Sequence, residues 1–330
     1  MKKLLLFLML SGMLMASRAQ QDPAYSMYMF NGLYLNPAYA GSQEVISLTG
    51  IYRHQWVGLN GSPRTANLSV HMPFPKNQYA IGLVVSNDRI GLANTLNATP
   101  SFAYRLKVKN TKICFGIQAS FTYFYRNNAD SEFPTENPDH TASLNTNLFV
   151  PNVGAGIYVY GRKYFVGASV PHLMPAALRG KTRLLNYSED VARIYNYYVF
   201  TAGYVVGKEE SIVKFRPTIL MKWQEGLPNN IPQFDFNLAL LFIDRVWVGA
   251  SLRTQGDART NDGKKMPFGP ESVIGYVQVK VTRQFQLGYA YDASLSKLRN
   301  AHSGTHEIML GYDFWFTKNR FVTPRFVSYF

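Results

Sequence analysis

Hydrophobic and polar residues alternate along most of the chain beyond residue 44. From residue 283 to 292, for example, Phe285, Leu287, Tyr289 and Tyr291 are separated by polar or small residues. Side chains of a strand point alternately to opposite faces, so such a stretch has one apolar face and one polar face. The pattern predicts about 14 strands, over residues 44–56, 64–72, 78–88, 93–108, 111–126, 152–160, 163–170, 194–206, 211–223, 231–243, 245–254, 271–281, 283–292 and 304–317.

The connections between these strands differ in length. Most links after even-numbered strands are very short, such as residues 109–110 and 161–162, whereas residues 127–151, 171–193 and 255–270 form long loops. Short turns at one end and long loops at the other are typical of an outer-membrane barrel, with the short turns in the periplasm. We therefore predict an all-β fold, a transmembrane antiparallel β-barrel of outer-membrane type. An even strand number would place both termini in the periplasm.

A soluble two-sheet protein would show the same alternation, and composition favours the barrel. Charged residues make up only 16% of the chain and aromatic residues 15%, whereas soluble domains are about one-quarter charged. Such a bias fits a lipid-facing band with aromatic girdles. In residues 231–243 we expect Leu238 to face lipid and Asn237 the lumen, so arginine should be tolerated better at Asn237.

The chain begins with features of an export signal. Lys2 and Lys3 precede an apolar run, and small residues follow it up to Ala19, so residues 1–19 are interpreted as a signal peptide. We then expect an N-terminal periplasmic or plug segment over 20–43, a barrel over 44–317 and a tail over 318–330.

Charge and cysteine content narrow the possible partners. The net charge is +14, but the basic residues do not form one cluster, and export argues against nucleic acid. Anionic lipid headgroups or an acidic partner are the better interpretation. The single cysteine, Cys114, excludes an internal disulfide and is expected to face inward.

The segment before the first strand is rich in aromatic residues. It offers candidate partner-binding residues, with simple packing across the periplasmic mouth as the alternative: Tyr25, Tyr28, Phe30, Tyr34, Asn36, Pro37 and Tyr39. Asn36-Pro37 is turn chemistry that would set the entry to the barrel.

Polar residues that alternation points inward form a candidate network in the lumen: Arg53, His71, Asp88, Lys214, Arg216, Asp235, Asp292 and Glu307. His306 and Glu307 face opposite sides and cannot share a metal. Ser69 and His71 share a face but have no identifiable third partner for nucleophilic catalysis. We predict no enzyme activity, no metal and no cofactor. Trp247 and Trp315 point inward and could fill the bore.

Several short motifs occur in a fixed order. They are Gln21 to Asn31, Asn36 to Gly41, Arg53-His54-Gln55-Trp56, Gly61 to Thr65, Asn87 to Gly91, Ala290-Tyr291-Asp292 and Ser303 to Ile308. Together they resemble the PorP/SprF family, outer-membrane proteins of the type IX secretion and gliding machinery of Bacteroidota. The chain departs from the family in Gly-Thr-His-Glu at 304–307, where Gly-Ser-His-Glu is expected, and in four residues beyond Phe326.

The resemblance implies a non-enzymatic barrel that docks secreted cargo, such as an adhesin with a type IX sorting domain, at the cell surface. It also implies links to periplasmic ring or peptidoglycan-linked components. A pore or ligand-conducting channel is the alternative. The sequence leaves both functions open.

Overall fold

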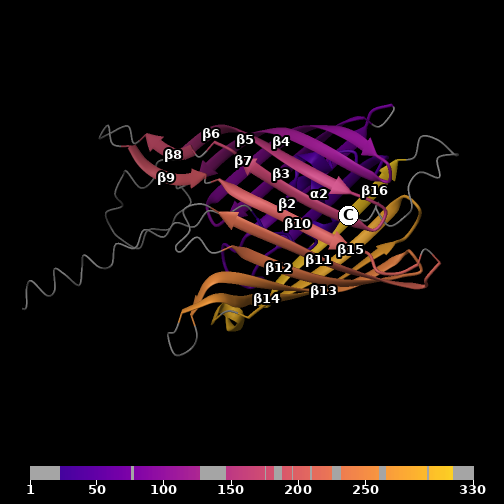
Figure 1. Cartoon of the computed structure of the whole chain (residues 1–330). Coiled ribbons are helices and arrows are strands. Elements are labelled where there is room, and N and C mark those ends of the chain that lie inside the picture. The colour runs from indigo at the N-terminus through magenta and orange to yellow at the C-terminus, as the bar shows by residue number, and fades with distance from the viewer. Residues whose placement is uncertain are drawn as a thin grey trace, which may run out of the picture.

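The computed structural model describes residues 23–75, 78–126, 146–174, 176–181, 188–194, 196–208, 210–224, 232–259, 265–295 and 297–314. Within them, fourteen antiparallel strands form one closed barrel (Figure 1). The predicted fold is therefore confirmed. The barrel strands are β1 (Ile46–His54), β2 (Arg64–Pro73), β3 (Tyr79–Ile90), β4 (Ala93–Val108), β5 (Thr111–Arg126), β6 (Thr146–Tyr160), β7 (Tyr164–His172), β10 (Tyr197–Tyr204), β11 (Val213–Gln224), β12 (Gln233–Phe242), β13 (Val246–Arg259), β14 (Lys265–Lys280), β15 (Phe285–Ser294) and β16 (Thr305–Phe314).

Pairing of the first and last strands closes the barrel. β1 and β16 are antiparallel, from Ile46 opposite Phe314 to His54 opposite His306. Every other barrel strand pairs with two neighbours, so the described barrel has no open edge. Lipid provides no hydrogen-bond partners for free backbone groups, and closure satisfies this requirement.

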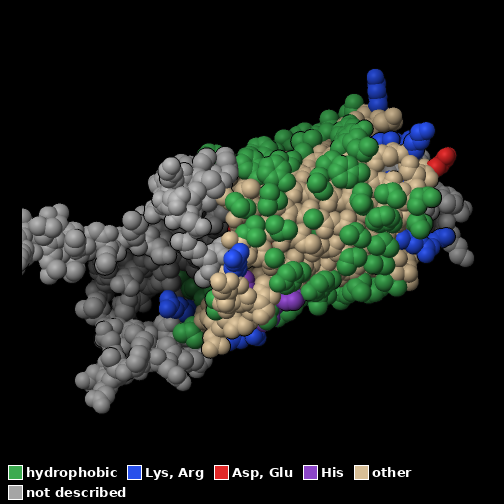
Figure 2. Space-filling model, turned by 90° about the horizontal axis from the view of Figure 1, so that it is seen from below, with side chains coloured by type: hydrophobic (Ala, Val, Ile, Leu, Met, Phe, Trp, Pro, Cys, Tyr) green, Lys and Arg blue, Asp and Glu red, His purple; other side chains and the backbone are tan. Residues whose placement is uncertain are grey.

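The two faces of the strands follow the predicted alternation. On β12, Leu238 is 56% exposed on the outside, whereas Asn237 is 1% exposed in the lumen. Cys114 is buried, as expected. Hydrophobic side chains cover the middle of the barrel face seen in Figure 2, and Lys and Arg side chains gather toward its two ends. Such a band is what a lipid-spanning barrel presents to the bilayer. Among the described residues, no helix has the length and apolar character needed to cross a membrane.

All three predicted long loops are partly strand. β6 begins at Thr146 rather than at residue 152. The predicted 255–270 loop is also partly strand, because β13 continues to Arg259 and β14 begins at Lys265. A further hairpin, β8 (Ala176–Lys181) and β9 (Ser188–Ile194), forms a separate two-stranded sheet in the predicted 171–193 loop. Strands that extend beyond the lipid band need no apolar face, so alternation could not predict these extensions.

The connections give the barrel two different mouths. At the turn-side mouth, where β1 begins and β16 ends, the strands are joined through residues 74–78, 109–110, 161–163, 205–212, 243–245 and 281–284. The loop-side mouth carries the connections 55–63, 91–92, 127–145, 173–196, 225–232, 260–264 and 295–304. In the 243–245 connection, Ile243 and Asp244 both adopt positive φ, and the Arg245 N–H donates to the Phe242 carbonyl at 2.9 Å, which closes a tight turn.

The segment before β1 lies inside the barrel. Three short helical pieces follow one another there: η1 (Tyr28–Phe30), α2 (Gly32–Leu35) and η2 (Pro37–Tyr39). Their side chains are almost all buried, and Met27 and Ala38 are fully so. Figure 1 shows α2 within the ring of strands. We refer to residues 23–45 as the plug.

Candidate functional site

The plug runs through the lumen from one mouth to the other. Near the loop-side mouth, the Ser26 and Met27 N–H groups donate to the Glu307 carboxylate at 2.8 and 2.7 Å. Near the turn-side mouth, the Gly41 N–H donates to His71 Nδ1 at 3.2 Å, and Glu44 forms an ion pair with Lys112. The first described residues of the chain therefore lie toward the long loops, on the opposite side from the start of β1.

This path changes the prediction for the N-terminus. The start of β1 and the end of β16 do share the turn-side mouth, as an even strand number requires. The inference that both termini lie there assumed that the leading segment stays at that mouth. Instead Ala24 and Tyr25 accept hydrogen bonds from Arg253, which is paired with Asp235 near the loop-side end of β12.

Lumen-facing glycines form the seat of the plug. A Cβ added at Gly116 would overlap the Ala38 backbone, and one at Gly156 would overlap the Asn36 side chain. At Gly82 an added Cβ would approach the Leu33 side chain to 2.9 Å. Glycine in a strand interior weakens the strand and often marks close approach of another backbone. At these positions the absence of a side chain on the barrel wall makes room for the plug.

Asparagine side chains fasten the plug to the wall. The Asn36 Nδ2 group donates to the backbone carbonyls of Ile157 at 2.9 Å and Ala168 at 3.3 Å. Its Oδ1 accepts from the Ala38 N–H at 2.9 Å, so the same side chain caps η2. Asn31 donates to Asn67 and accepts from Ser69, both at 2.8 Å. Asn36 therefore sets the turn before β1, as its position beside Pro37 predicted.

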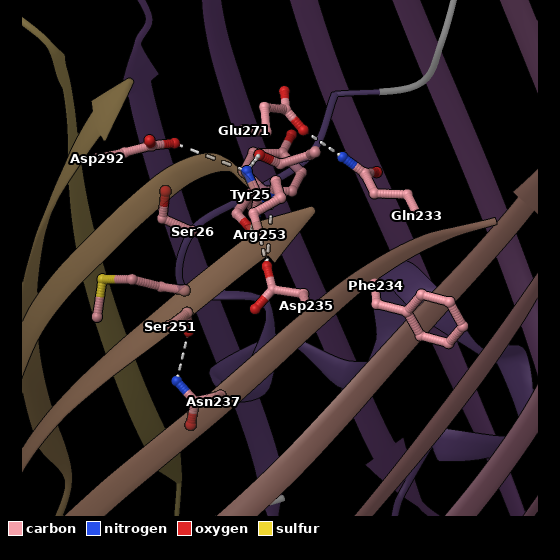
Figure 3. A network of polar contacts seen from close by, with 12 residues as sticks. Tyr25, Ser26, Gln233, Phe234, Asp235, Asn237, Ser251, Arg253, Glu271 and Asp292 are labelled. Carbon is pink, nitrogen blue, oxygen red and sulfur yellow. Dashed lines mark hydrogen bonds and ion pairs between the residues drawn. The ribbon is translucent and has the colours of Figure 1, made fainter. Parts of the chain in front are cut away.

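A buried charge network joins five side chains of the barrel wall. Arg53 lies 3.0 Å from Asp292 and 3.2 Å from Glu307, and Arg253 lies 2.9 Å from Asp235 and 3.6 Å from Asp292. Figure 3 shows Arg253 between the two aspartates, with Tyr25 of the plug beside it. All five side chains are at most 7% exposed. Each buried arginine thus has carboxylate partners, which its burial requires.

The plug completes this network. Glu307 accepts two plug N–H groups besides Arg53, and Arg53 also donates to Ser26 Oγ at 2.6 Å. Arg253 donates to plug carbonyls. The network spans β12, β13, β15, β16 and β1, so it also crosses the β1–β16 pair that closes the barrel.

The other predicted lumen residues point inward but lie outside this network. Lys214 pairs with Asp244 at 2.5 Å, and Arg216 lies over the rings of Trp247 at 3.9 Å and Phe30 at 5.4 Å. Asp88 accepts a hydrogen bond from Thr65 Oγ1 at 2.6 Å. Trp247 is buried in the lumen as predicted, whereas Trp315 lies outside the described residues.

Arg253 is the network member that sequence reasoning missed. It lies six residues after Trp247 on β13 and therefore shares its inward face. Strand alternation could therefore have predicted that Arg253 faces the lumen. Its ion pair with Asp235 could not be predicted without the strand register that sets the two residues opposite each other.

The candidate partner-binding residues are all part of the plug. Six of them are buried, and Tyr34 is half-buried, with its hydroxyl donating to the Pro23 carbonyl at 3.0 Å. Tyr34 packs edge-on against Tyr25, with ring centroids 4.7 Å apart. Only a small hollow lies between Tyr25 and Tyr34 and the wall residues Lys222 and Gln233. Partner binding by these residues stays a prediction, and the plug leaves them little surface for it.

The motifs of the sequence meet at the loop-side mouth. The Val57 N–H donates to the Gly304 carbonyl, the Ser303 N–H to the Val57 carbonyl and the Gly91 N–H to the Gly61 carbonyl, all at 2.7–2.9 Å. Three connections far apart in the sequence are thereby fixed to one another. They form a structured rim on this side of the mouth.

The side chains considered for metal binding and catalysis have other contacts in the described structure. No group of three His, Cys, Asp or Glu side chains among them could hold a metal ion. The Ser69 hydroxyl donates to Asn31 Oδ1 at 2.8 Å, and His71 Nδ1 accepts the Gly41 N–H. Both groups hold the plug.

Comparison with known proteins agrees with the membrane barrel. Residues 17–312 match the family described as type IX secretion system membrane protein PorP/SprF. No curated protein matches the chain.

Similar solved structures are distant in sequence. The toluene transporter TbuX of Ralstonia pickettii is 12% identical with a TM-score of 0.48, and the match covers 87% of this chain and 94% of TbuX. A Pseudomonas aeruginosa FadL homologue is 11% identical with a TM-score of 0.47, over 89% of this chain and 95% of that one. Omp33 of Acinetobacter baumannii is 11% identical with a TM-score of 0.41, over 82% and 98%. The assignment rests on the family match, which spans nearly all of the described barrel: the chain belongs to the PorP/SprF family of type IX secretion system membrane proteins.

Proposed function

We propose that this outer-membrane barrel is a plugged, non-enzymatic docking protein. It holds a secreted cargo at the cell surface and connects to periplasmic components of the type IX machinery. The observation that carries the proposal is the plug, which crosses the whole lumen and completes a buried charge network. A conducting channel would need a continuous polar passage, so the plug favours docking over the pore alternative.

The long loops support cargo docking outside the cell. The β8–β9 hairpin adds a separate sheet next to β6 at the loop-side mouth. Phe149, Leu173 and Met174 are 64%, 46% and 43% exposed near this mouth. Exposed apolar residues grouped at a rim often mark a protein interface. A cargo with a type IX sorting domain is the partner we propose; predicted loop residues 127–145 lie outside the described part.

The turn-side mouth supports a periplasmic link. Its rim exposes Lys107, Lys109, Arg162, Lys208, Arg245 and Arg283. Two acids of this mouth, Glu44 and Asp244, are already paired with lysines. A basic rim attracts an acidic partner. We propose acidic ring or peptidoglycan-linked components there.

The path of the plug also sets the orientation of the chain. With the short turns in the periplasm, residue 23 lies on the extracellular side of the lumen, and the end of β16 lies on the periplasmic side.

Removal of the β8–β9 hairpin tests the docking function. Replacing residues 174–195 by a short Gly-Ser link should release the cargo into the medium, while heat-modifiable gel mobility of the barrel stays unchanged. An equal replacement within the 295–303 connection serves as a control for loop shortening. Unchanged cargo display in both variants would contradict docking by this hairpin.

A further inference from the structure

A row of basic and imidazole side chains interrupts the apolar outer face at the loop-side rim. β-pairing sets His306 opposite His54, His54 opposite Arg64, and Arg64 opposite Arg89. The four residues lie at the loop-side ends of β16, β1, β2 and β3. They therefore form one continuous row across four neighbouring strands.

All four side chains belong to the outer face. The adjacent residues Arg53, Thr65 and Glu307 are buried in the lumen, so alternation turns His54, Arg64 and His306 outward. Arg64 and Arg89 are exposed, and the two histidines are half-buried. The His54 ring contacts Ser62 Oγ at 3.2 Å, and the His306 ring contacts the Tyr289 hydroxyl at 2.7 Å. These two contacts hold the histidine rings in place.

No ion pair within the described residues balances the positive charge of this row. Like charges directly opposite each other destabilise a strand pair, yet Arg64 faces Arg89. No carboxylate in the described residues forms an ion pair with either arginine. The neighbouring Asp88 points to the other face, where it accepts from Thr65. A ligand from outside can supply the missing anion.

The depth of the row indicates the source of that anion. Toward the membrane middle, Tyr52 and Ile308 are the next outward residues after His54 and His306 and are both 48% exposed, and Leu68, two outward positions beyond Arg64, is 51% exposed. Tyr291 packs edge-on against His306, with centroids 5.2 Å apart. Aromatic residues of this kind mark the boundary between hydrocarbon and headgroups. The row thus lies at headgroup depth, next to apolar residues on β16, β1 and β2.

We propose that Arg64 and Arg89, flanked by His54 and His306, bind the phosphate of a lipid headgroup in the leaflet at the loop-side mouth. Paired positions of antiparallel strands lie about 5 Å apart, so both guanidinium groups can reach one phosphate. The guanidinium fork matches phosphate geometry. The acyl chains would lie along Leu68 and Ile308. Under the proposed orientation, this is the outer leaflet.

Native mass spectrometry of the purified full-length protein tests the site, with phosphatidic acid as the probe. Phosphatidic acid should stay bound, and R64Q/R89Q should weaken its affinity about thirtyfold, the fold-change that corresponds to about 1 kcal/mol for each of the two basic residues at a membrane surface. The matched control R245Q/R283Q removes the same charge from the turn-side rim and should keep wild-type affinity. Inorganic phosphate at equal concentration should compete poorly, since it lacks acyl chains.

Three results would overturn the lipid site. These are equal affinity of wild type and R64Q/R89Q, an equal loss in the R245Q/R283Q control, or full competition by inorganic phosphate. An acidic peptide that binds through Arg64 and Arg89 while phosphatidic acid does not would also refute it. Heat-modifiable gel mobility of each variant checks that the barrel is folded. Failure of the lipid-site proposal would leave the cargo-docking proposal unaffected.

Discussion

At the scale of single residues, Glu307 connects the plug to the closing seam of the barrel. Its side chain is fully buried and accepts Arg53 as well as two plug N–H groups. A buried carboxylate is tolerated only when paired and hydrogen-bonded. The fastening of the plug and the pairing of β1 with β16 therefore depend on the same side chain.

Glu307→Gln should lower the free energy of unfolding by about 3 kcal/mol, because it leaves buried Arg53 with one carboxylate fewer. Urea titration of the barrel in lipid vesicles measures this. Asp244→Asn, which breaks the more exposed pair with Lys214 at the turn-side rim, should cost less. Equal losses in the two variants would show that Glu307 has no special role.

The lipid-facing residues predict a dependence on depth. Leu238→Arg near the middle of β12 should cost about 2–4 kcal/mol, and Val213→Arg at the turn-side end of β11 about 0–1 kcal/mol. Both side chains face outward, at 56% and 44% exposure. Vesicle unfolding titrations compare them, and equal costs would contradict the placement of the membrane band.

The lumen around Asn237 is packed, and this changes the expectation that arginine is tolerated there. Asn237 is 1% exposed and bonds Ser251 at 2.6 Å and the Tyr276 hydroxyl at 3.0 Å. The inward direction of its side chain was predictable, but a free lumen was assumed. Arginine there would displace these partners.

At the scale of elements, the plug and its glycine seat fit each other. Gly116→Val should expel the plug, because the new side chain occupies the place of the Ala38 backbone. Gly275→Val on β14 is the matched control, since nothing lies within 4 Å of its added Cβ. Limited proteolysis in detergent should cut the plug only in the Gly116 variant. Protection of the plug in both variants would mean that the seat does not hold it.

Strand alternation predicted the barrel, the facing of its side chains and most strand bounds. It could not reveal that residues 23–45 fill the lumen, because short helical pieces packed by contacts from many strands leave no periodic pattern. The aromatic side chains of Tyr25, Phe30, Tyr34 and Tyr39 indicated only that this segment packs against something or binds a partner. The glycines at 116 and 156 were visible, but their meaning depends on Ala38 and Asn36 lying against them.

At the scale of the whole molecule, the plug places residue 23 and the end of β16 at opposite mouths of the barrel. A short epitope tag inserted after Asp22 should bind antibody on intact cells, because residue 23 lies toward the long loops. The same tag in the 281–284 turn should bind antibody only after the outer membrane is opened. Labelling of both tags only in opened cells would reverse the proposed orientation of the N-terminus.

The central claim is that the barrel is closed by its own N-terminal segment, and ion conductance in planar bilayers tests it most directly. The purified wild-type protein should carry no large steady current, whereas a variant lacking residues 23–43 should carry one if it inserts as a folded barrel. Gly116→Val should show intermediate, flickering currents. Large steady currents through the wild-type protein, equal to those of the deletion variant, would contradict the plugged barrel and favour the pore.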